Sequence, residues 1–212
     1  MDAKNYGHAI TFNDNATVNI LKLEYDVLHD PDFAFIDEAT RAKVKDSYDR
    51  GIDCTLKCQL TVDGKFTAWA QQYDAEKMVP VKARAFELEG LAAGESSAIL
   101  GMFMDIQNPS EPIRQAVHAG AEWFESVKIT GKKLEKRDGD IFVVDDPAAE
   151  PMWSRFYEIG TNRPFFVGRD GIKKYDVSEI EKERRLGYAW LRPFWGADVA
   201  KKYADWKLKY PK

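Results

Sequence analysis

WSRFYEIGTNRPFFVGRDGIKKYDVSEIEKERRLGYAW, residues 153–190, is the stretch around which we read this chain, because aromatic side chains alternate in it with cations. From residue 151 to 192 there are nine Lys and Arg against six Asp and Glu, a local net charge of +3, whereas residues 1–150 carry 17 against 27, a net −10. A basic, aromatic platform on an acidic protein suits an anionic ligand with flat apolar faces. Polyuronic acids and nucleic acids both fit that description.

Length, composition and charge narrow the class of protein and the class of ligand. A chain of 212 residues is long enough for one sizeable core, and we expect a single domain over residues 1–212. The net charge of −4 and the pI of about 5.5 argue against a general nucleic-acid binder. No run of about 20 apolar residues occurs, so we expect no membrane span. The N-terminal segment MDAKNYGHAI has no apolar core of a signal peptide.

Outward from the basic stretch, apolar residues recur with the spacing of amphipathic helices. The clearest stripe follows Ser110, a plausible N-cap, with Pro112 in the first turn. Its members are Ile113, Ala116, Val117, Gly120, Ala121, Phe124 and Val127. The same patterning predicts further helices over about residues 16–28, 37–60, 95–107, 178–191 and 197–208.

Two long segments between these helices lack such periodicity. They cover residues 65–94 and 128–177, with short strands possible at 127–129 and 141–144. Long irregular segments in compact domains are usually functional or disordered, and their aromatic content argues against disorder. We therefore predict an all-α scaffold whose long loops form a site at one end.

Few residues of the sequence point to chemistry by themselves. Asp14, within Asn13-Asp14-Asn15, is either part of a helix cap or an oxygen ligand for a hard cation. By themselves, Lys82 and Arg84 are typical of a solvated basic pair. Arg155, flanked by aromatic residues, has the setting of a guanidinium held for bidentate carboxylate binding. Arg169 is either a turn residue with an ion pair or a second such group.

Taken together and in order, several segments resemble family 10 polysaccharide lyases, the pectate lyases. They are HAITFNDNATVN, GIDCTLKCQL, TAWAQQYD, ARAFE followed by GESSAI, AEWFES, and the stretch at 153–190. The resemblance spans essentially the whole chain. It implies a mainly α fold, the (α/α)₃ toroid, and calcium-assisted cleavage of polygalacturonate by anti β-elimination.

The resemblance also implies roles for individual residues. Arg84 in ARAFE matches the proposed base, and Asp14 in TFND matches a calcium-ligand aspartate. Arg155 in WSRFY and Arg169 in GRDG match contacts to the substrate carboxylate. Lys82 would add positive charge to the binding site. Trp69, Tyr73 and Trp153 either stack on sugar faces or belong to the core. An arginine base needs neighbouring cations, with Lys82 and the metal as candidates, to lower its pKa.

One departure from the family affects these expectations. Nothing in residues 1–12 matches an N-terminal T-I-D-N-G-A-T-like segment, whose aspartate serves the calcium and substrate site. The chain therefore resembles the C-terminal two-thirds of the module, as a fragment or a shortened version with an incomplete toroid. The resemblance implies a secreted or periplasmic protein, which we expect to be monomeric. Two alternatives stay open: a non-catalytic pectate-binding remnant of a lyase, and a helical-toroid glycosidase.

Overall fold

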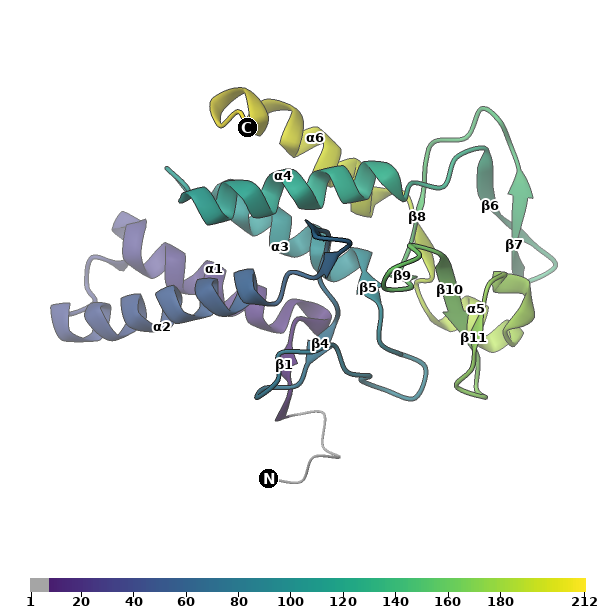
Figure 1. The fold of residues 1–212 in the computed structure, drawn as a ribbon, viewed down its shortest axis with the longest axis horizontal. Coiled ribbons are helices and arrows are strands. Elements are labelled where there is room, and N and C mark those ends of the chain that lie inside the picture. Colours follow the sequence, from purple (N-terminus) through teal and green to yellow (C-terminus); the bar gives the residue numbers. More distant parts are fainter. Residues whose placement is uncertain (1–7) are drawn as a thin grey trace.

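The protein, described by a computed structural model over residues 8–212, combines helices and short strands (Figure 1). Residues 1–7 lie outside the described residues. The α-helices are α1 (Ala16–His29), α2 (Glu38–Lys57), α3 (Ala93–Asp105), α4 (Glu111–Ser126), α5 (Lys182–Gly187) and α6 (Phe194–Lys209). Short 3₁₀ turns are η2 (Asn13–Asn15), η3 (Pro31–Phe33) and η4 (Val177–Glu179). The strands are β1 (Ile10–Thr11), β2 (Thr61–Val62), β3 (Lys65–Phe66), β4 (Gln72–Tyr73), β5 (Leu91–Ala92), β6 (Lys132–Arg137), β7 (Asp140–Asp145), β8 (Trp153–Ser154), β9 (Phe156–Tyr157), β10 (Pro164–Val167), β11 (Lys173–Lys174) and β12 (Leu191–Arg192).

The long helices gather in one half of the molecule, and β8 to β11 lie with α5 in the other (Figure 1). Helix α3 is central, because it contacts α1, α4 and α6, while α1 and α2 pack on each other. These helices bury the apolar stripes that the sequence predicts, and α4 turns Ile113 and Phe124 into the core. None of the helices within residues 8–212 is long and apolar enough to cross a membrane.

The prediction of an all-α toroid is wrong. The structure is 46% helical and 18% strand, and its strands form several small sheets. The largest is antiparallel, in the order β11-β10-β9-β5, with Leu91 opposite Tyr157 and Ala92 opposite Phe156. Most strands have two residues, too few for an alternating pattern to show in the sequence.

The four-stranded sheet connects the basic stretch to the start of α3. Strand β5 runs directly into α3, so pairing with β9 fixes where that helix begins. Gly90 precedes β5, and a Cβ atom there would lie 2.7 Å from the Phe165 ring and 2.9 Å from the Tyr157 carbonyl oxygen. Only glycine permits this close approach. A second hydrophobic cluster, which includes Phe156 and Trp190, lies at this sheet, separate from the cluster between the helices.

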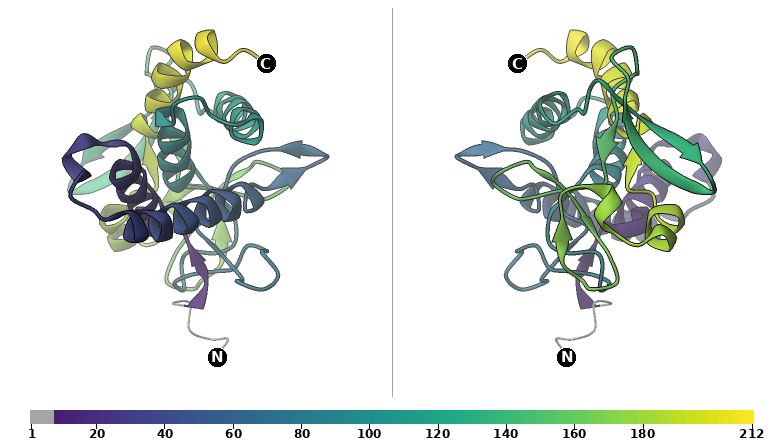
Figure 2. Two further views of the ribbon diagram at one scale, coloured as in Figure 1. Left: turned by 90° about the vertical axis from the view of Figure 1, so that its left-hand side faces the viewer. Right: turned by 90° about the vertical axis from the view of Figure 1, so that its right-hand side faces the viewer.

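The helix that we predicted from Ser178 begins later. Asp176 caps η4 instead, with its side chain accepting a hydrogen bond from the Ser178 backbone N–H at 2.8 Å, and α5 starts only at Lys182. Arg185 of α5 then forms an ion pair with Asp140 at the start of β7. This pair fastens the β6–β7 hairpin, which projects from the opposite side of the molecule to the β2–β3 hairpin (Figure 2).

Candidate functional site

Arg84 lies in the loop between β4 and β5, and Glu87 of the same loop holds its guanidinium. The Nε atom donates to Glu87 Oε2 at 2.6 Å, and Nη2 donates to Oε1. The Glu87 side chain is fully buried, whereas that of Arg84 is 44% exposed. Arg84 therefore presents part of its guanidinium to solvent from a fixed, buried anchor.

This pairing sets the protonation of both groups. The hydrogen bond to Glu87 raises the pKa of Arg84 above its usual value, and the charges of Glu87, Tyr188 and Asp14 raise it further. Burial alone would raise the pKa of Glu87, but the hydrogen bonds from Arg84 and Tyr188 outweigh it and lower that pKa. We expected neighbouring cations to depress the pKa of Arg84, and the structure shows the opposite shift because its nearest partner is an anion.

Arg155 sits between β8 and β9, and its partner is Glu95 in the first turn of α3. Arg155 Nη2 donates to Glu95 Oε1 at 2.8 Å, and the two side chains are 13% and 3% exposed. Gln71 Nε2 donates to the same oxygen at 2.9 Å. Burial raises the pKa of Glu95, and the Arg155 charge and the Gln71 hydrogen bond counter that rise. The Glu95 Oε2 and Arg155 Nε atoms are buried and have no hydrogen-bond partner among residues 8–212.

Tyr188 connects the two arginines. Its hydroxyl donates to Glu87 Oε1 at 2.7 Å, and its ring centroid lies 4.8 Å from the guanidinium carbon of Arg155. Cation–π contacts of this kind are attractive and restrict the position of the cation. The structure therefore connects Arg84 and Arg155, which are far apart in the sequence, through one tyrosine: Arg84 by way of Glu87, and Arg155 directly.

Arg169 belongs to the turn after β10 and remains exposed. Its guanidinium forms an ion pair with Glu183, from Nε to Oε1 at 2.5 Å, and its backbone N–H donates to Glu181. The same turn approaches the Arg84 loop, since a Cβ atom on Gly171 would lie 3.4 Å from the Ala85 carbonyl oxygen. The backbone places Arg169 beside the loop of Arg84, although its side chain is engaged elsewhere.

Asp14 is exposed in η2 and adopts a left-handed backbone conformation with φ of 52°. Its charge contributes to the raised pKa of Arg84. Calcium takes six to eight oxygen ligands, usually including several carboxylates. Within residues 8–212 no group of three or more His, Cys, Asp or Glu side chains could hold a metal ion. The described residues therefore do not by themselves form a calcium cage, and Asp14 could supply only part of one.

Two residues that we considered for sugar stacking belong to the core. Trp69 and Tyr73 are both 0% exposed. The Trp69 indole donates to the Thr55 carbonyl oxygen at 2.8 Å, and the Tyr73 hydroxyl accepts from the Ala70 N–H at 2.6 Å. Neither ring faces solvent, which favours the core alternative for both. Trp153 is likewise buried. Lys82 is exposed on the Arg84 loop.

Sequence reasoning missed the two carboxylates and the tyrosine that organise the arginines. Glu87 ends the ARAFE segment, three residues after Arg84, and that spacing was the available signal for an ion pair. Glu95 looked like an acidic residue in a helical first turn, where the helix dipole already favours it. The position of Tyr188 gave no signal, because its contacts with Glu87 and Arg155 depend on how distant loops meet.

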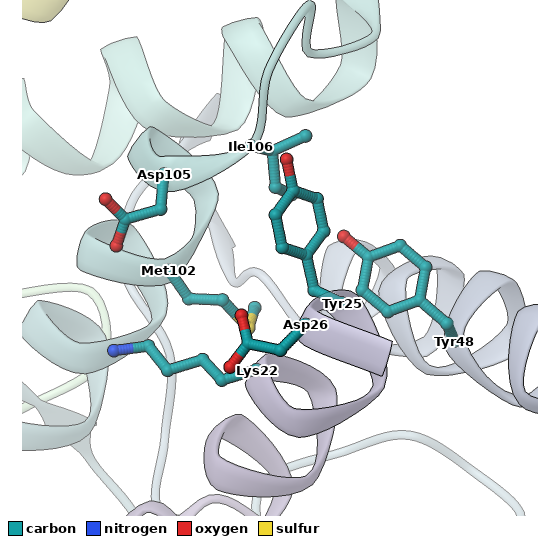
Figure 3. A pocket seen from close by; sticks show the side chains of 7 residues that line it. All are labelled: Lys22, Tyr25, Asp26, Tyr48, Met102, Asp105 and Ile106. Carbon is teal, nitrogen blue, oxygen red and sulfur yellow. The ribbon is translucent and has the colours of Figure 1, made fainter. Parts of the chain in front are cut away.

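The site is separate from the pocket shown in Figure 3, a cavity of about 190 Å³ between α1, α2 and α3. Its lining residues are Lys22, Tyr25, Asp26, Tyr48, Met102, Asp105 and Ile106. The Tyr25 hydroxyl accepts a hydrogen bond from the Gln107 N–H at 3.1 Å, just beyond the end of α3. The Tyr25 hydroxyl thus accepts a backbone hydrogen bond at the C-terminal end of α3. Arg84, Arg155 and Arg169 do not line this pocket.

This chain is similar to solved structures of polysaccharide lyases. The family 10 polysaccharide lyase from Cellvibrio cellulosa is similar, with a TM-score of 0.87 and 33% sequence identity over 95% of this chain and 63% of that one. A mutant of that lyase in complex with trigalacturonic acid is similar with a TM-score of 0.84 and 32% identity, over 96% of this chain and 63% of that one. This chain thus spans less than two-thirds of the length of these structures. A search of curated proteins gave no match.

The profile of the pectic acid lyase family matches residues 2–200, nearly the whole chain. The segments that carried the resemblance lie within that range, including the loops that hold Arg84, Arg155 and Arg169. The chain belongs to the pectic acid lyase family.

Proposed function

We propose that this protein is a pectate lyase, which cleaves polygalacturonate by anti β-elimination within one domain and as a monomer. The observation that supports the proposal is the link between Arg84 and Arg155 through Glu87 and Tyr188, with the Arg169 turn beside the Arg84 loop. Guanidinium groups suit carboxylates, which they bind with paired hydrogen bonds. The trigalacturonic acid bound to the similar lyase mutant is a ligand of that class. We further propose that the protein meets its substrate outside the cytoplasm.

In the proposed reaction, Arg84 removes the proton from C5 of a galacturonate residue. The electron pair of that C–H bond forms the C4–C5 double bond, and the O4 substituent leaves with the electrons of its bond to C4 and takes a proton from water. Negative charge grows on the neighbouring carboxylate while the proton leaves. Arg155 and Arg169 would hold that carboxylate and stabilise the added charge, and such stabilisation is usually the largest part of the acceleration.

Arg84 can accept this proton only as a neutral guanidine. The Glu87 hydrogen bond raises its pKa, so the neutral form is a small fraction of the protein at neutral pH. A neutral guanidine is in return a strong base, which suits a weak carbon acid. The reaction should therefore be faster at alkaline pH.

Calcium is part of the proposal as a bound partner of the substrate, with Asp14 as one carboxylate ligand. Such an ion would offset the negative charge of the uronate. Residues 8–212 supply no complete set of ligands for it. Polygalacturonate itself carries carboxylates that could complete the coordination.

The decisive experiment is to incubate the protein with polygalacturonate and calcium and to follow the ultraviolet absorbance of the new double bond. The Arg84→Ala variant should lose at least about 100-fold in kcat, the lower range for general-base catalysis. Arg50→Ala is the matched control, since Arg50 is an exposed arginine of α2 paired with Asp46. Circular dichroism should show equal helical content in both variants. A wild-type protein without absorbance change would contradict the proposal.

A second candidate is a pectate-binding protein without catalysis. The paired, protonated state of Arg84 favours it, because a guanidinium cation binds carboxylates but abstracts no proton. This candidate predicts saturable binding of trigalacturonate in calorimetry with no absorbance change. If the protein shows no binding of trigalacturonate and no absorbance change, both candidates are contradicted.

A further inference from the structure

The carboxylate of Glu87 receives more hydrogen bonds than an ordinary surface ion pair would supply. Three come from Arg84: the backbone N–H at 3.2 Å, Nε at 2.6 Å and Nη2. The fourth comes from the Tyr188 hydroxyl at 2.7 Å. Glu87 is 1% exposed, so these contacts are shielded from water and from competing ions.

A purely stabilising role does not explain this arrangement. Burying a carboxylate has a large desolvation cost. The ion pair with Arg84, whose side chain remains 44% exposed, offsets little of that cost. The contacts around Arg84 and Tyr188, the two partners of Glu87, instead fix where these side chains lie. Phe86 packs edge-to-face against Tyr188 at 5.2 Å between ring centroids, and the guanidinium carbon of Arg84 lies 5.2 Å from the Phe86 ring centroid. The contacts restrict the orientation of the Arg84 guanidinium.

The network continues to the second arginine. Tyr188 contacts Glu87 through its hydroxyl and Arg155 through its ring face, and Glu95 holds the far side of Arg155. Each arginine thus has its own buried carboxylate, and Tyr188 lies between the two ion pairs. The charges facing Glu87 are Arg84 and, at longer range, Glu95, while Asp14 and Tyr188 also act on Arg84.

We propose that Glu87 is a positioning residue that, together with the Tyr188 hydroxyl, fixes the Arg84 guanidinium relative to that of Arg155. This proposal rests on the lyase function proposed above. The fixed geometry serves the elimination step, because proton abstraction requires Arg84 to meet C5 while Arg155 holds the carboxylate next to it. Misplacement by about 1 Å can reduce the rate of a chemical step by roughly 100-fold without weakening binding.

The experiment compares kcat and KM for polygalacturonate in wild type, Glu87→Gln and Glu87→Asp. Glu87→Gln keeps the shape but removes the charge, and we expect kcat to fall by about 10- to 100-fold with KM changed less than about twofold. Glu87→Asp restores the charge and should recover part of kcat. The control is Glu76→Gln, an exposed glutamate of the same loop, whose kinetics should match wild type.

The variant Tyr188→Phe tests the other end of the network and keeps the ring beneath Arg155. We expect a smaller loss in kcat, about threefold to tenfold, because one of the four hydrogen bonds to Glu87 is removed. If Glu87→Gln fails to fold, Tyr188→Phe tests the positioning role in its place. A kcat of Tyr188→Phe equal to that of wild type would then overturn the proposal.

A second readout does not depend on activity. Phenylglyoxal modifies arginines, and mass spectrometry of peptides gives the rate at each position. In Glu87→Gln the rate at Arg84 should rise several-fold, because its carboxylate clamp is lost, while the rate at Arg155 stays unchanged. An unchanged rate at Arg84, or a rise in KM with wild-type kcat, would overturn the positioning role. A wild-type protein that is inactive would refute the lyase function and the catalytic part of this inference, and the modification rates would still decide whether Glu87 fixes Arg84.

Discussion

Arg155 and Glu95 form a 2.8 Å ion pair between residues 60 positions apart, and it joins the basic stretch to the first turn of α3. Both side chains are largely shielded from water, and removing one partner from a buried pair leaves the other uncompensated. We predict that Glu95→Gln lowers the free energy of unfolding by roughly 3 kcal/mol. Urea denaturation measures the change.

Glu111→Gln is the control for that variant, since Glu111 occupies the first turn of α4 but is exposed. Its stability should stay within about 0.5 kcal/mol of wild type. Equal stability of Glu95→Gln and wild type would show that the pair contributes no net stabilisation.

Arg169 offers the opposite case, an arginine whose loss should affect binding more than folding. Its guanidinium and Glu183 are both exposed, and exposed ion pairs contribute about 0 to 1 kcal/mol. We predict that Arg169→Ala raises KM for polygalacturonate about tenfold, the loss of one charge-assisted contact, and leaves the urea midpoint nearly unchanged. A large loss of stability with a normal KM would exclude Arg169 from substrate binding.

Asp14 allows a test of calcium without disturbing the backbone. Its φ of 52° is one that Asp and Asn adopt more readily than other non-glycine residues, so Asp14→Asn removes the charge alone. If Asp14 is a ligand, the calcium concentration for half-maximal activity should rise more than about tenfold, and EDTA should abolish wild-type activity. Asp63→Asn is the matched control, an exposed aspartate at φ of 49° in the β2–β3 turn. Wild-type calcium dependence in Asp14→Asn would rule out the ligand role.

The ion pair between Asp140 and Arg185 predicts a pH dependence of stability. Its hydrogen bonds lower the pKa of Asp140 to about 2 in the folded protein, against about 3.9 in the unfolded chain. A depressed pKa contributes stability above pH 3.9, and this contribution is lost as pH falls toward 2. Asp140→Asn should therefore be less stable than wild type at pH 7, and the difference should shrink between about pH 4 and 2.

The measurement is urea denaturation across that pH range. Asp145→Asn, at the exposed end of the same hairpin, should show a much smaller difference at every pH. A difference for Asp140→Asn that does not change with pH would exclude the ion pair as its source.

The helices could be predicted from the sequence because each carries several turns of apolar spacing. α4 and α1 begin and end within a few residues of the predicted positions, since their stripes are long and their ends are marked by Pro112 and Pro31. The two-residue strands could not be predicted. β9 exists because β5 and β10 flank it, and that information lies in tertiary contacts rather than in the two residues themselves.

The candidate site shows the same division. Specific roles for Arg84, Arg155 and Arg169 came only from the resemblance to a family, because isolated arginines near aromatic residues are common. The structure then adds what no linear pattern contains: Glu87 and Tyr188 meet although they are 101 residues apart. The fold class was wrong for a related reason. The periodicity of the longer helices was interpreted correctly, and the strand expected at 141–144 lies within β7, but the two-residue strands in the loops left no pattern.

The main chain of Arg155 is tied on both sides, its N–H donating to the Trp190 carbonyl oxygen and its carbonyl oxygen accepting from the Ala93 N–H. Arg169 sits in a surface turn, where the exposed Glu183 side chain pairs with its guanidinium and the Glu181 side chain accepts from its N–H. The two arginines that we propose bind the substrate carboxylate therefore differ in how they can be redesigned. Altered sugar specificity should be sought by varying position 169 and its turn, whereas a change at 155 would require rebuilding the junction between the sheet and α3.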